Sequence, residues 1–365
     1  MTSFSRIVLM TPRIGGADGV SAVSRQYLRV IEQWASDIEA RVEVWTLCDE
    51  PRPAGVAERL EFYSAADSQI AFAARAVRAS SIDSSVLVLV MHLHLLPVTL
   101  PLEYRGARVV TLLHGVEAWK PLRPLQRLAL SHGWRTASVS AHTAARFRAS
   151  NPEFAALPIR VCHSSVGDLV MPARRSISAS PYALIVGRMA EEERYKGHDL
   201  LLDIWSRVRQ IVPGARLVIT GDGNDRARLQ QKSAALGYGD AVQFTGGVTD
   251  EALAALYRDA AMFVMPSRDE GLGLVFLEAM RAGTPCIAAT GAAEEVIDDG
   301  VNGLIVDSAD SQALVDAITR LFEDTALRER LGDDARRRVM QHFGPDAFAA
   351  RARDLLGLTS VPVAC

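Results

Sequence analysis

Two glutamates flank a short apolar stretch that contains two glycines, in the segment "SRDEGLGLVFLEAM" (267–280). The segment follows an apolar run that is typical of a buried strand, and its own apolar spacing predicts a helix that runs to about Arg281. Glu270 would then lie in the loop before the helix, and Glu278 would lie about one turn inside it. Carboxylates at these two places can both reach a ligand that binds at the helix start.

The start of this predicted helix is a candidate anion site, because the first N–H groups of a helix have no partner inside it. The amides concerned belong to Gly273, Leu274 and Val275. The arrangement suits a nucleotide sugar, with its diphosphate on the amides, its ribose hydroxyls on Glu278 and a sugar hydroxyl on Glu270. The stretch alone leaves open a simpler interpretation, in which one glutamate stabilises the helix start and the other is an ordinary surface residue.

Two cations lie on a second predicted loop, "VGRMAEEERYKGHD" (186–199), which follows another apolar strand pattern. Arg188 and Lys196 can neutralise a diphosphate and stabilise it as a leaving group. Such a pair can equally be a solvated surface pair, and the two residues do not decide this by themselves.

Strand-like apolar runs alternate with amphipathic helical patterns along the whole chain of 365 residues. In the first half the runs are 6–11, 41–47, 85–91, 107–114 and 136–140, and in the second half they are 182–187, 215–221, 241–246, 261–266, 285–289 and 303–306. The helical patterns include 21–34, 198–212 and 250–258. Near-continuous apolar strands separated by helices predict parallel sheets covered on both faces. We therefore expect an α/β protein with two Rossmann-like domains.

The series of strands restarts after a segment rich in Pro, Ser and Arg, 171–181, which we interpret as the linker between the domains. The predicted domains are 1–172 and 173–343. A C-terminal segment, 344–365, would form a helix near 345–356 that crosses back to the first domain. Ligands are expected at the carboxyl ends of the strands, in the cleft between the domains.

Composition and charge exclude several classes of function. Residues 1–172 hold 18 basic and 15 acidic side chains, and the remainder holds 22 and 28, which is too weak a basic excess for a nucleic-acid partner. The four cysteines are far apart, so free thiols in a reducing compartment are expected. The N-terminus lacks the apolar region of a signal peptide, and the apolar run 86–100 is too short to span a bilayer. We expect a soluble cytoplasmic protein that can touch the inner face of a membrane.

Five short motifs follow one another in the second half: Gly187-Arg188, Lys196-Gly197, "GDG" at 221–223, "FTG" at 244–246, and Glu270 with Glu278 in "EGLGLVFLEAM". In this order they resemble retaining glycosyltransferase family 4, and the resemblance covers essentially the whole second half. It implies the GT-B fold and α-glycosyl transfer from a nucleotide sugar with retention, without an organic cofactor or an active-site metal. It also implies that the domain 1–172 binds the acceptor and that the domain 173–343 binds the nucleotide-sugar donor, with Arg188 and Lys196 on the diphosphate. In the same way, Glu270 would contact the donor sugar near its reacting face, Glu278 would hold the ribose, and Val248 would lie near the base.

The first half resembles the family more loosely. The glycine turn "PRIGGADGVS" (12–21) is similar to the family's Gly-Gly loop, which implies that an amide of Gly15 or Gly16 contacts the donor phosphate. His114 ends a predicted strand, where the family places a histidine beside the donor sugar. A structural role for His114 stays open, and Glu117 can face either the ligand or solvent. The segment "HSSVGD" (163–168) departs from the family's Gly-Val-Asp turn, so its hinge contacts are not carried over.

A retaining enzyme needs either a covalent intermediate or attack from the front face within an ion pair. Glu270 is the only plausible carboxylate near the anomeric carbon, and it is needed for a sugar hydroxyl, so the resemblance favours the front-face route. Two rival functions stay open, a sugar-nucleotide epimerase of the same fold and a catalytically silent nucleotide-sugar-binding subunit. The sequence does not choose between UDP- and GDP-hexoses as donors, or between a glycan and a lipid-linked glycan as acceptor.

Metal-binding patterns are weak. Paired aspartates at 298–299 and 333–334 lack the spacing of a hard-metal site. His92 and His94 would share one face of a strand, but without a third ligand a packed role or a cleft-lining role is favoured.

The segment 120–148 contains basic residues and no acidic residue, with leucines and tryptophans between them. Its cations are Lys120, Arg123, Arg127, Arg135, Arg146 and Arg148, and its apolar residues include Leu125, Leu128, Leu130 and Trp134, with Trp119 just before. This pattern predicts weak, salt-sensitive binding to an anionic lipid surface and a lipid-linked acceptor. The alternative is a solvated basic helix face above a leucine core.

Overall fold

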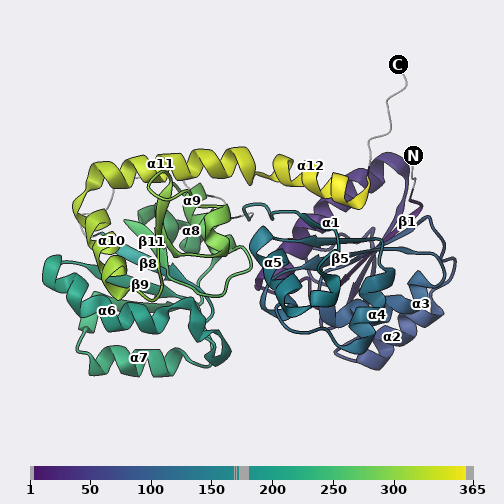
Figure 1. Ribbon diagram of the computed structural model, residues 1–365, viewed down its shortest axis with the longest axis horizontal. Helices are drawn as coiled ribbons and strands as arrows, with labels where there is room; N and C mark the ends of the chain where they lie inside the picture. Colours follow the sequence, from purple (N-terminus) through teal and green to yellow (C-terminus); the bar gives the residue numbers. More distant parts are fainter. Residues whose placement is uncertain (1–3, 168, 170, 172–180, 359–365) are drawn as a thin grey trace, which may run out of the picture. The chain divides into compact units, whose positions relative to one another are not determined.

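The computed structural model describes residues 4–167, 169, 171 and 181–358. The chain forms two compact units (Figure 1). One unit consists of Met1–Ser165 together with Pro345–Cys365, and the other is Val166–Gly344. The predicted linker, 171–181, lies outside the described residues except at its two ends.

The N-terminal unit is built on one parallel sheet with strand order β3-β2-β1-β4-β5-β6-β7. Its strands are β1 (Arg6–Thr11), β2 (Arg41–Thr46), β3 (Glu61–Ser64), β4 (Val86–Val90), β5 (Arg108–Leu113), β6 (Arg135–Ser138) and β7 (Ile159–Val161). Its helices are α1 (Gly19–Ile38), α2 (Gln69–Arg78), α3 (Leu100–Glu103), α4 (Pro124–His132), α5 (Ala141–Ser150) and α12 (Pro345–Leu356). Short 3₁₀ helices are η1 (Leu93–Thr99), η2 (Val116–Ala118) and η3 (Pro152–Phe154).

The C-terminal unit has a second parallel sheet with strand order β10-β9-β8-β11-β12-β13. Its strands are β8 (Tyr182–Val186), β9 (Arg216–Thr220), β10 (Val242–Gly246), β11 (Met262–Met265), β12 (Cys286–Ala289) and β13 (Gly303–Val306). Its helices are α6 (His198–Ile211), α7 (Arg226–Ala235), α8 (Asp250–Asp259), α9 (Leu274–Arg281), α10 (Ser311–Glu323) and α11 (Thr325–His342). The 3₁₀ helices here are η4 (Glu191–Lys196), η5 (Gly239–Ala241) and η6 (Ala292–Glu295).

Burial explains which strands the sequence revealed. Every residue of β1, β4 and β11 is buried, which produces the continuous apolar runs expected of a parallel sheet covered on both faces. All six strands that the structure describes in the C-terminal sheet were predicted and are confirmed. The edge strands β3 and β7 were not predicted, because they are short and mostly exposed or half-buried and so carry no apolar run.

The apolar run 86–100 is only in part the strand that was predicted. The strand β4 ends at Val90, and the chain then turns into η1 and α3. The prediction that His92 and His94 share a strand face is therefore wrong. His92 precedes η1, its ring Nδ1 accepts a hydrogen bond from the amide of His94 (3.2 Å), and the two rings lie 4.6 Å apart. A side chain that caps a turn in this way ends the strand locally.

The last helix, α12, belongs to the N-terminal unit. It packs against α1 (Figure 1), where the rings of Tyr27 and Phe348 meet edge to face at 5.1 Å between centroids. Arg135 donates a hydrogen bond to the carbonyl of Asp354 (3.0 Å), which attaches the helix to β6 as well. The helix predicted near 345–356 is thus confirmed.

Among the described residues, the cysteines Cys48, Cys162 and Cys286 are free thiols. A search of the same residues finds no helix with the length and apolarity needed to cross a bilayer.

Candidate functional site

The donor-site residues predicted in the second half follow neighbouring strands of one parallel sheet. Strand β8 precedes the loop with Arg188, and β11, its partner in the sheet, precedes the loop with Glu270. The carboxyl ends of parallel strands lie at one edge, so these loops are neighbours. The amide of Arg268 donates a hydrogen bond to the carbonyl of Tyr195 (3.2 Å) and joins them directly.

The two predicted cations, Arg188 and Lys196, meet at one carboxylate, that of Glu193. A guanidinium nitrogen of Arg188 donates a hydrogen bond to Oε1 of Glu193, and Nζ of Lys196 lies 3.1 Å from Oε2. Burial acts to raise the pKa of Glu193, but the hydrogen bond from Arg188 and the charge of Lys196 outweigh it, and the pKa is lowered. The carboxylate therefore stays ionised between its two partners.

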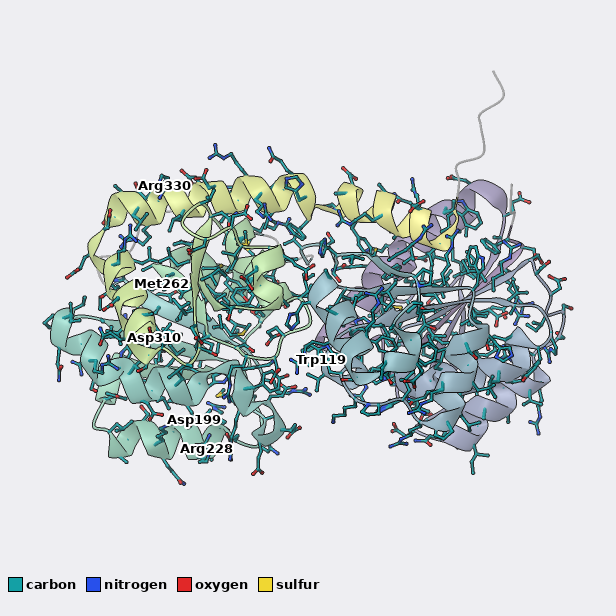
Figure 2. The ribbon with its side chains drawn as sticks, viewed as in Figure 1. Trp119, Asp199, Arg228, Met262, Asp310 and Arg330 are labelled. Carbon is teal, nitrogen blue, oxygen red and sulfur yellow. The ribbon has the colours of Figure 1, made fainter. Side chains whose placement is uncertain are left out.

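An ion network fixes the 3₁₀ segment η4, which carries these groups. Arg194 of η4 binds both carboxylate oxygens of Asp225 (2.7 and 2.9 Å), and Arg228 of α7 bridges Asp225 and Asp199. Asp199 on α6 and Arg228 on α7 are both labelled in Figure 2. Hydrogen bonds from Arg228 and Arg194 hold the pKa of Asp225 well below its usual range, and Arg228 lowers that of Asp199 to about 2. The network thus anchors the cation loop to two helices.

Two positions in this region require glycine. Gly197, at the end of η4, has φ of +94°, and a Cβ there would lie 2.7 Å from Cγ of Pro266. Gly273, the residue before α9, has φ of +83°, and a Cβ would lie 2.5 Å from the ring of Phe276. Both positions need the left-handed backbone that glycine adopts without strain. Gly197 lets the cation loop pack closely against Pro266, which follows β11, and Gly273 lets the chain turn closely under Phe276 of α9.

Helix α9 begins at Leu274, as expected, so the amides of Leu274 and Val275 belong to its first turn. Glu270 lies in the loop before it, where Oγ of Ser267 donates a hydrogen bond to Oε1 of Glu270 (3.2 Å). Burial raises the pKa of Glu270, and the charge of Lys196 and the bond from Ser267 oppose that rise. The hydrogen bond from the amide of Arg268 to the carbonyl of Tyr195 is the contact that holds the cation loop beside the α9 loop.

Glu278 lies on the fifth residue of α9 and has a buried partner. Oη of Tyr257, from α8, donates a hydrogen bond to its Oε2 (2.9 Å), and Tyr257 is completely buried. Burial raises the pKa of Glu278 to about 7, although the tyrosine bond lowers it. Gly167 passes close by, since a Cβ built on it would lie 3.5 Å from Oε1 of Glu278, and its carbonyl accepts a hydrogen bond from Arg281 (2.7 Å). Glu278 is a half-buried carboxylate with one oxygen held in place.

The "GDG" and "FTG" motifs complete the same edge of the sheet. A Cβ on Gly221 would lie 2.1 Å from the carbonyl oxygen of Gly187, so the two loops touch backbone to backbone. Val248 follows β10 and is half-buried just before α8. The strand that precedes Val248, β10, lies two positions from β8 in the strand order of the sheet, with β9 between them.

The glycine loop of the N-terminal unit is held by an aspartate that the sequence analysis did not single out. Asp49 accepts hydrogen bonds from the amides of Ile14 (2.5 Å) and Gly15 (3.1 Å), and Arg25 donates to the carbonyl of Gly16 (2.8 Å). The amide of Gly15 is therefore engaged within the protein. Gly16 is tightly packed, because a Cβ there would lie 2.6 Å from Asp18 and from Ser21.

His114 follows β5 in the same unit, and its Nε2 can accept or donate one further hydrogen bond. The ring of His114 is hydrogen-bonded to the backbone of Met91. Its buried Nε2 has no hydrogen-bond partner among the described residues. Burial lowers the pKa of His114, so the ring is neutral near pH 7. Glu117, for which two roles were left open, accepts hydrogen bonds from the amides of His114 (2.7 Å) and Gly115 (3.2 Å) and so shapes this turn.

The predicted residues thus fall into two groups, one in each unit. Arg188, Lys196, Glu270, Glu278 and the first turn of α9 gather at one edge of the C-terminal sheet, and Gly15, Gly16 and His114 follow β1 and β5 of the N-terminal sheet. Sequence reasoning missed Glu193, Tyr257, Asp49 and Asp225. Glu193 had a signal, since it lies in an acidic run between two cations, whereas the partner of a buried tyrosine cannot be read from spacing.

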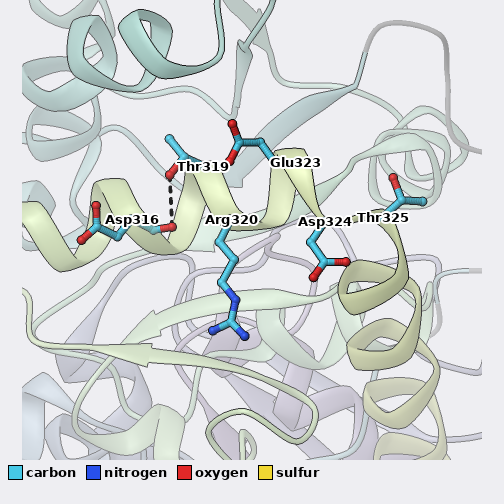
Figure 3. Close-up of a pocket in the computed structure, with 6 residues that line it drawn as sticks. All are labelled: Asp316, Thr319, Arg320, Glu323, Asp324 and Thr325. Carbon is cyan, nitrogen blue, oxygen red and sulfur yellow. Dashed lines mark hydrogen bonds between the residues drawn. The ribbon is translucent and has the colours of Figure 1, made fainter.

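A shallow hollow of about 520 Å³ lies elsewhere on the C-terminal unit, at the turn from α10 to α11 (Figure 3). It is lined by Asp316, Thr319, Arg320, Glu323, Asp324 and Thr325. Thr319 donates its hydroxyl to the carbonyl of Asp316 (3.2 Å), so this polar group is already satisfied. None of the predicted donor residues lines this hollow. In the described part of the chain, no group of three or more His, Cys, Asp or Glu side chains is placed to hold a metal ion.

Known proteins are similar to this chain in sequence. A family model described as "Glycosyl transferases group 1" matches residues 172–338. The chain is 30% identical over 278 residues to a Mycolicibacterium smegmatis protein named GDP-mannose-dependent alpha-(1-6)-phosphatidylinositol monomannoside mannosyltransferase, which covers 70% of this chain and 72% of that protein. The protein of the same name from Mycobacterium tuberculosis is 37% identical over 169 residues, and this match spans only 44% of each chain.

Solved structures agree on the fold. HepE from Anabaena, solved in complex with UDP-glucose, superimposes with a TM-score of 0.78 at 18% identity, over 97% of this chain and all of that one. The GT-B fold expected from the sequence is confirmed. The predicted resemblance is confirmed too, and the chain belongs to the group 1 glycosyl transferases.

Proposed function

We propose that the protein transfers a hexosyl residue from a UDP- or GDP-sugar to a glycan or lipid-linked glycan acceptor, with retention at the anomeric carbon. The observation that carries the proposal is that the loop with Arg188 and Lys196 and the loop with Glu270 are neighbours at one edge of the sheet, beside the first turn of α9. Two cations and free helix amides suit a diphosphate, and a carboxylate beside them suits a sugar hydroxyl. Relatives that are named as mannosyltransferases support the reaction class.

Each residue then has a role. Arg188 and Lys196 bind the diphosphate together with the amides of Gly273, Leu274 and Val275. Glu278 accepts the ribose hydroxyls, Val248 lies against the base, and Glu270 binds a sugar hydroxyl. In the N-terminal unit, His114 bonds to the donor sugar through Nε2. Gly16 approaches the phosphate, and Gly15 shapes the turn because its own amide is bonded to Asp49.

The reaction follows a front-face route. The bond between the anomeric carbon and the leaving diphosphate oxygen breaks, and the acceptor oxygen forms its bond to the same face of the sugar. The proton of the acceptor hydroxyl passes to the leaving diphosphate, whose charge Arg188 and Lys196 stabilise. Electrostatic groups that are preorganised around a developing charge account for this kind of acceleration. Glu270 binds the sugar and forms no covalent bond to it.

The relatives support both donor classes. The mycobacterial relatives are named as GDP-mannose-dependent, whereas HepE was solved with UDP-glucose. A thermal-shift screen with nucleotides and nucleotide sugars identifies the donor, because a ligand that binds only the folded state raises its stability with the logarithm of saturation.

The product distinguishes the proposal from its rivals. With the donor found in the screen and a glycoside acceptor, a transferase produces free nucleoside diphosphate and an elongated glycoside with the donor's anomeric configuration. A sugar-nucleotide epimerase would produce an isomerised donor without an acceptor, and a silent binding subunit would produce neither. Accumulation of isomerised donor alone would replace the proposal.

Activity is expected to survive removal of divalent ions. The charges of Arg188 and Lys196 stand where a divalent ion would otherwise neutralise the diphosphate. The measurement is the rate of nucleotide release after dialysis against EDTA, with and without added Mn²⁺ or Mg²⁺. Loss of activity that either ion restores would contradict this expectation.

Binding of the nucleotide is expected to weaken as the pH falls through about 7, the pKa of Glu278 in the free protein. The ionised carboxylate accepts two hydroxyls, while the protonated form loses one acceptor. The bond from Tyr257 lowers this pKa, so Tyr257→Phe should move the midpoint to higher pH. Calorimetric titration with UDP and GDP from about pH 5.5 to about pH 9 measures this. Glu278→Gln is the control for protonation of the nucleotide itself, and identical profiles in all three proteins would refute the assignment.

Weak binding to anionic membranes is expected through α4 of the N-terminal unit. Leu125 and Leu128 are 58% and 39% exposed on this helix, next to Arg123 and Arg127, although Leu130 is buried in the core. Trp134 is half-buried and packs against Phe4 and two arginines. Each basic residue near an anionic bilayer contributes about 1 kcal/mol. With such contacts the protein would be a cytoplasmic enzyme at the inner face of the membrane.

Co-sedimentation with vesicles at low and high salt measures this binding. The double variant Arg123→Glu/Arg127→Glu should lose binding at low salt. The double variant Arg320→Glu/Arg330→Glu changes the net charge by the same amount, but on the C-terminal unit, and should bind the vesicles as the wild type does. Equal partitioning of the wild type at both salts would favour a soluble acceptor.

A further inference from the structure

Glu193 pairs with both Arg188 and Lys196, the two cations that the proposed function assigns to the donor diphosphate. Its two carboxylate oxygens are divided between them, with Oε1 bonded to Arg188 and Oε2 3.1 Å from Nζ of Lys196. The Glu193 and Lys196 side chains are only 12% and 18% exposed, so solvent screens this pair far less than a surface ion pair. Arg188 is 59% exposed and can turn toward a ligand.

The position of Glu193 is fixed by its neighbours. The next residue, Arg194, is held by the nearly buried carboxylate of Asp225, which Arg228 also binds. The preceding residue, Glu192, is exposed, and Glu191 pairs with Arg194 at 3.6 Å. Glu193 is therefore the member of a run of three glutamates that is directed at the cations.

Charge balance gives this contact a consequence. Two cations and one carboxylate leave a single positive charge, and a diphosphate that binds both cations brings its oxygens close to the carboxylate of Glu193. Like charges at such distances repel each other strongly in a poorly screened site. Diphosphate and Glu193 must therefore compete for the same partners.

We propose that Glu193 is a built-in counter-anion, which competes with the diphosphate for Arg188 and Lys196 and so weakens the binding of the product nucleotide and speeds its release. This rests on the proposed function, since it assigns the two cations to a diphosphate. The donor has additional contacts through its sugar, whereas the released nucleotide depends more heavily on its diphosphate. The released diphosphate also has an additional ionisable oxygen, which in the donor is esterified to the sugar, so repulsion by Glu193 weakens the product more than the donor.

Glu193→Gln removes the charge and keeps the size of the side chain and one acceptor oxygen. The affinity for a nucleoside diphosphate should rise about tenfold when one like charge is removed at this range. If Glu193 served only to position the two cations, the same change would weaken binding. Glu192→Gln is the matched control, because it removes the same charge from the exposed neighbouring position.

Calorimetric titration with pyrophosphate, UDP and GDP tests the proposal on wild type, Glu193→Gln and Glu192→Gln. Tighter binding of the probes by Glu193→Gln, with Glu192→Gln like wild type, supports the proposal. Unchanged or weaker binding by Glu193→Gln overturns it, and if wild type still binds UDP or GDP the proposed function stands. Tighter pyrophosphate binding without any nucleotide binding would support the counter-anion and overturn the proposed function. Absence of binding of every probe to all three proteins would overturn both.

Discussion

Replacing Lys196 with alanine is expected to lower kcat/KM for the nucleotide-sugar donor by a factor of about 30 to 1000. This corresponds to roughly 2–4 kcal/mol of transition-state stabilisation, the usual effect of removing one preorganised electrostatic donor. Arg188→Ala should have an effect of the same order, because both side chains bind the same carboxylate in the free protein and would hold the same diphosphate in the complex. Steady-state kinetics with the donor varied measures both changes.

Controls separate lost chemistry from lost structure. Lys196→Arg keeps the positive charge and should recover part of the activity, and Arg320→Ala removes an exposed cation from α10 and should have no effect. The thermal unfolding midpoint should change little in Lys196→Ala, because the carboxylate of Glu193 keeps its hydrogen bond from Arg188. Wild-type turnover in both Lys196→Ala and Arg188→Ala would show that the donor binds elsewhere.

Replacing Glu278 with glutamine is expected to weaken binding of UDP or GDP by about 10- to 150-fold. A hydrogen bond to a charged group contributes roughly 1.5–3 kcal/mol, and the amide loses both the charge and one acceptor. Glu270→Gln should leave the affinity for the bare nucleotide nearly unchanged and lower turnover, because Glu270 would contact the sugar. Calorimetry with the bare nucleotide and kinetics with the full donor distinguish the two effects.

One result would contradict the assignment of separate roles to Glu270 and Glu278. Equal loss of bare-nucleotide binding in Glu278→Gln and Glu270→Gln would mean that both carboxylates face the same part of the ligand. Near-identical unfolding curves for the two variants and wild type would show that the changes are local to the site.

The sequence predicted the C-terminal unit well, because all its described strands except the edge strand β10 are largely buried and several of its glycines are required by the backbone. The limits of β8 and β11 were visible as apolar runs, and the loop positions of Arg188 and Glu270 followed from them. The turn at Gly273 could be recognised from the sequence because its backbone conformation and close packing require glycine there. The contact of Tyr257 with Glu278 was not visible, since it joins two helices through side chains whose directions depend on packing.

The N-terminal unit was harder to predict. Strands β3 and β7 lie at the sheet edges, where one face or more is open and the apolar pattern is lost. The apolar run through His92 looked like one strand, but a side-chain hydrogen bond to the backbone turns the chain at that point. The bond from the amide of Gly15 to Asp49 joins residues 34 positions apart and has no local signal.

A crystal structure of the protein with bound UDP or GDP would show whether Arg188 and Lys196 bind the diphosphate. The account predicts that the diphosphate oxygens lie within hydrogen-bonding distance, about 3 Å, of Nζ of Lys196 and the guanidinium of Arg188. It also predicts that the ribose hydroxyls bond to Glu278, whose second oxygen keeps its bond from Tyr257. A nucleotide bound away from the β8 and β11 loops, with Arg188 and Lys196 still paired to Glu193 alone, would contradict the account.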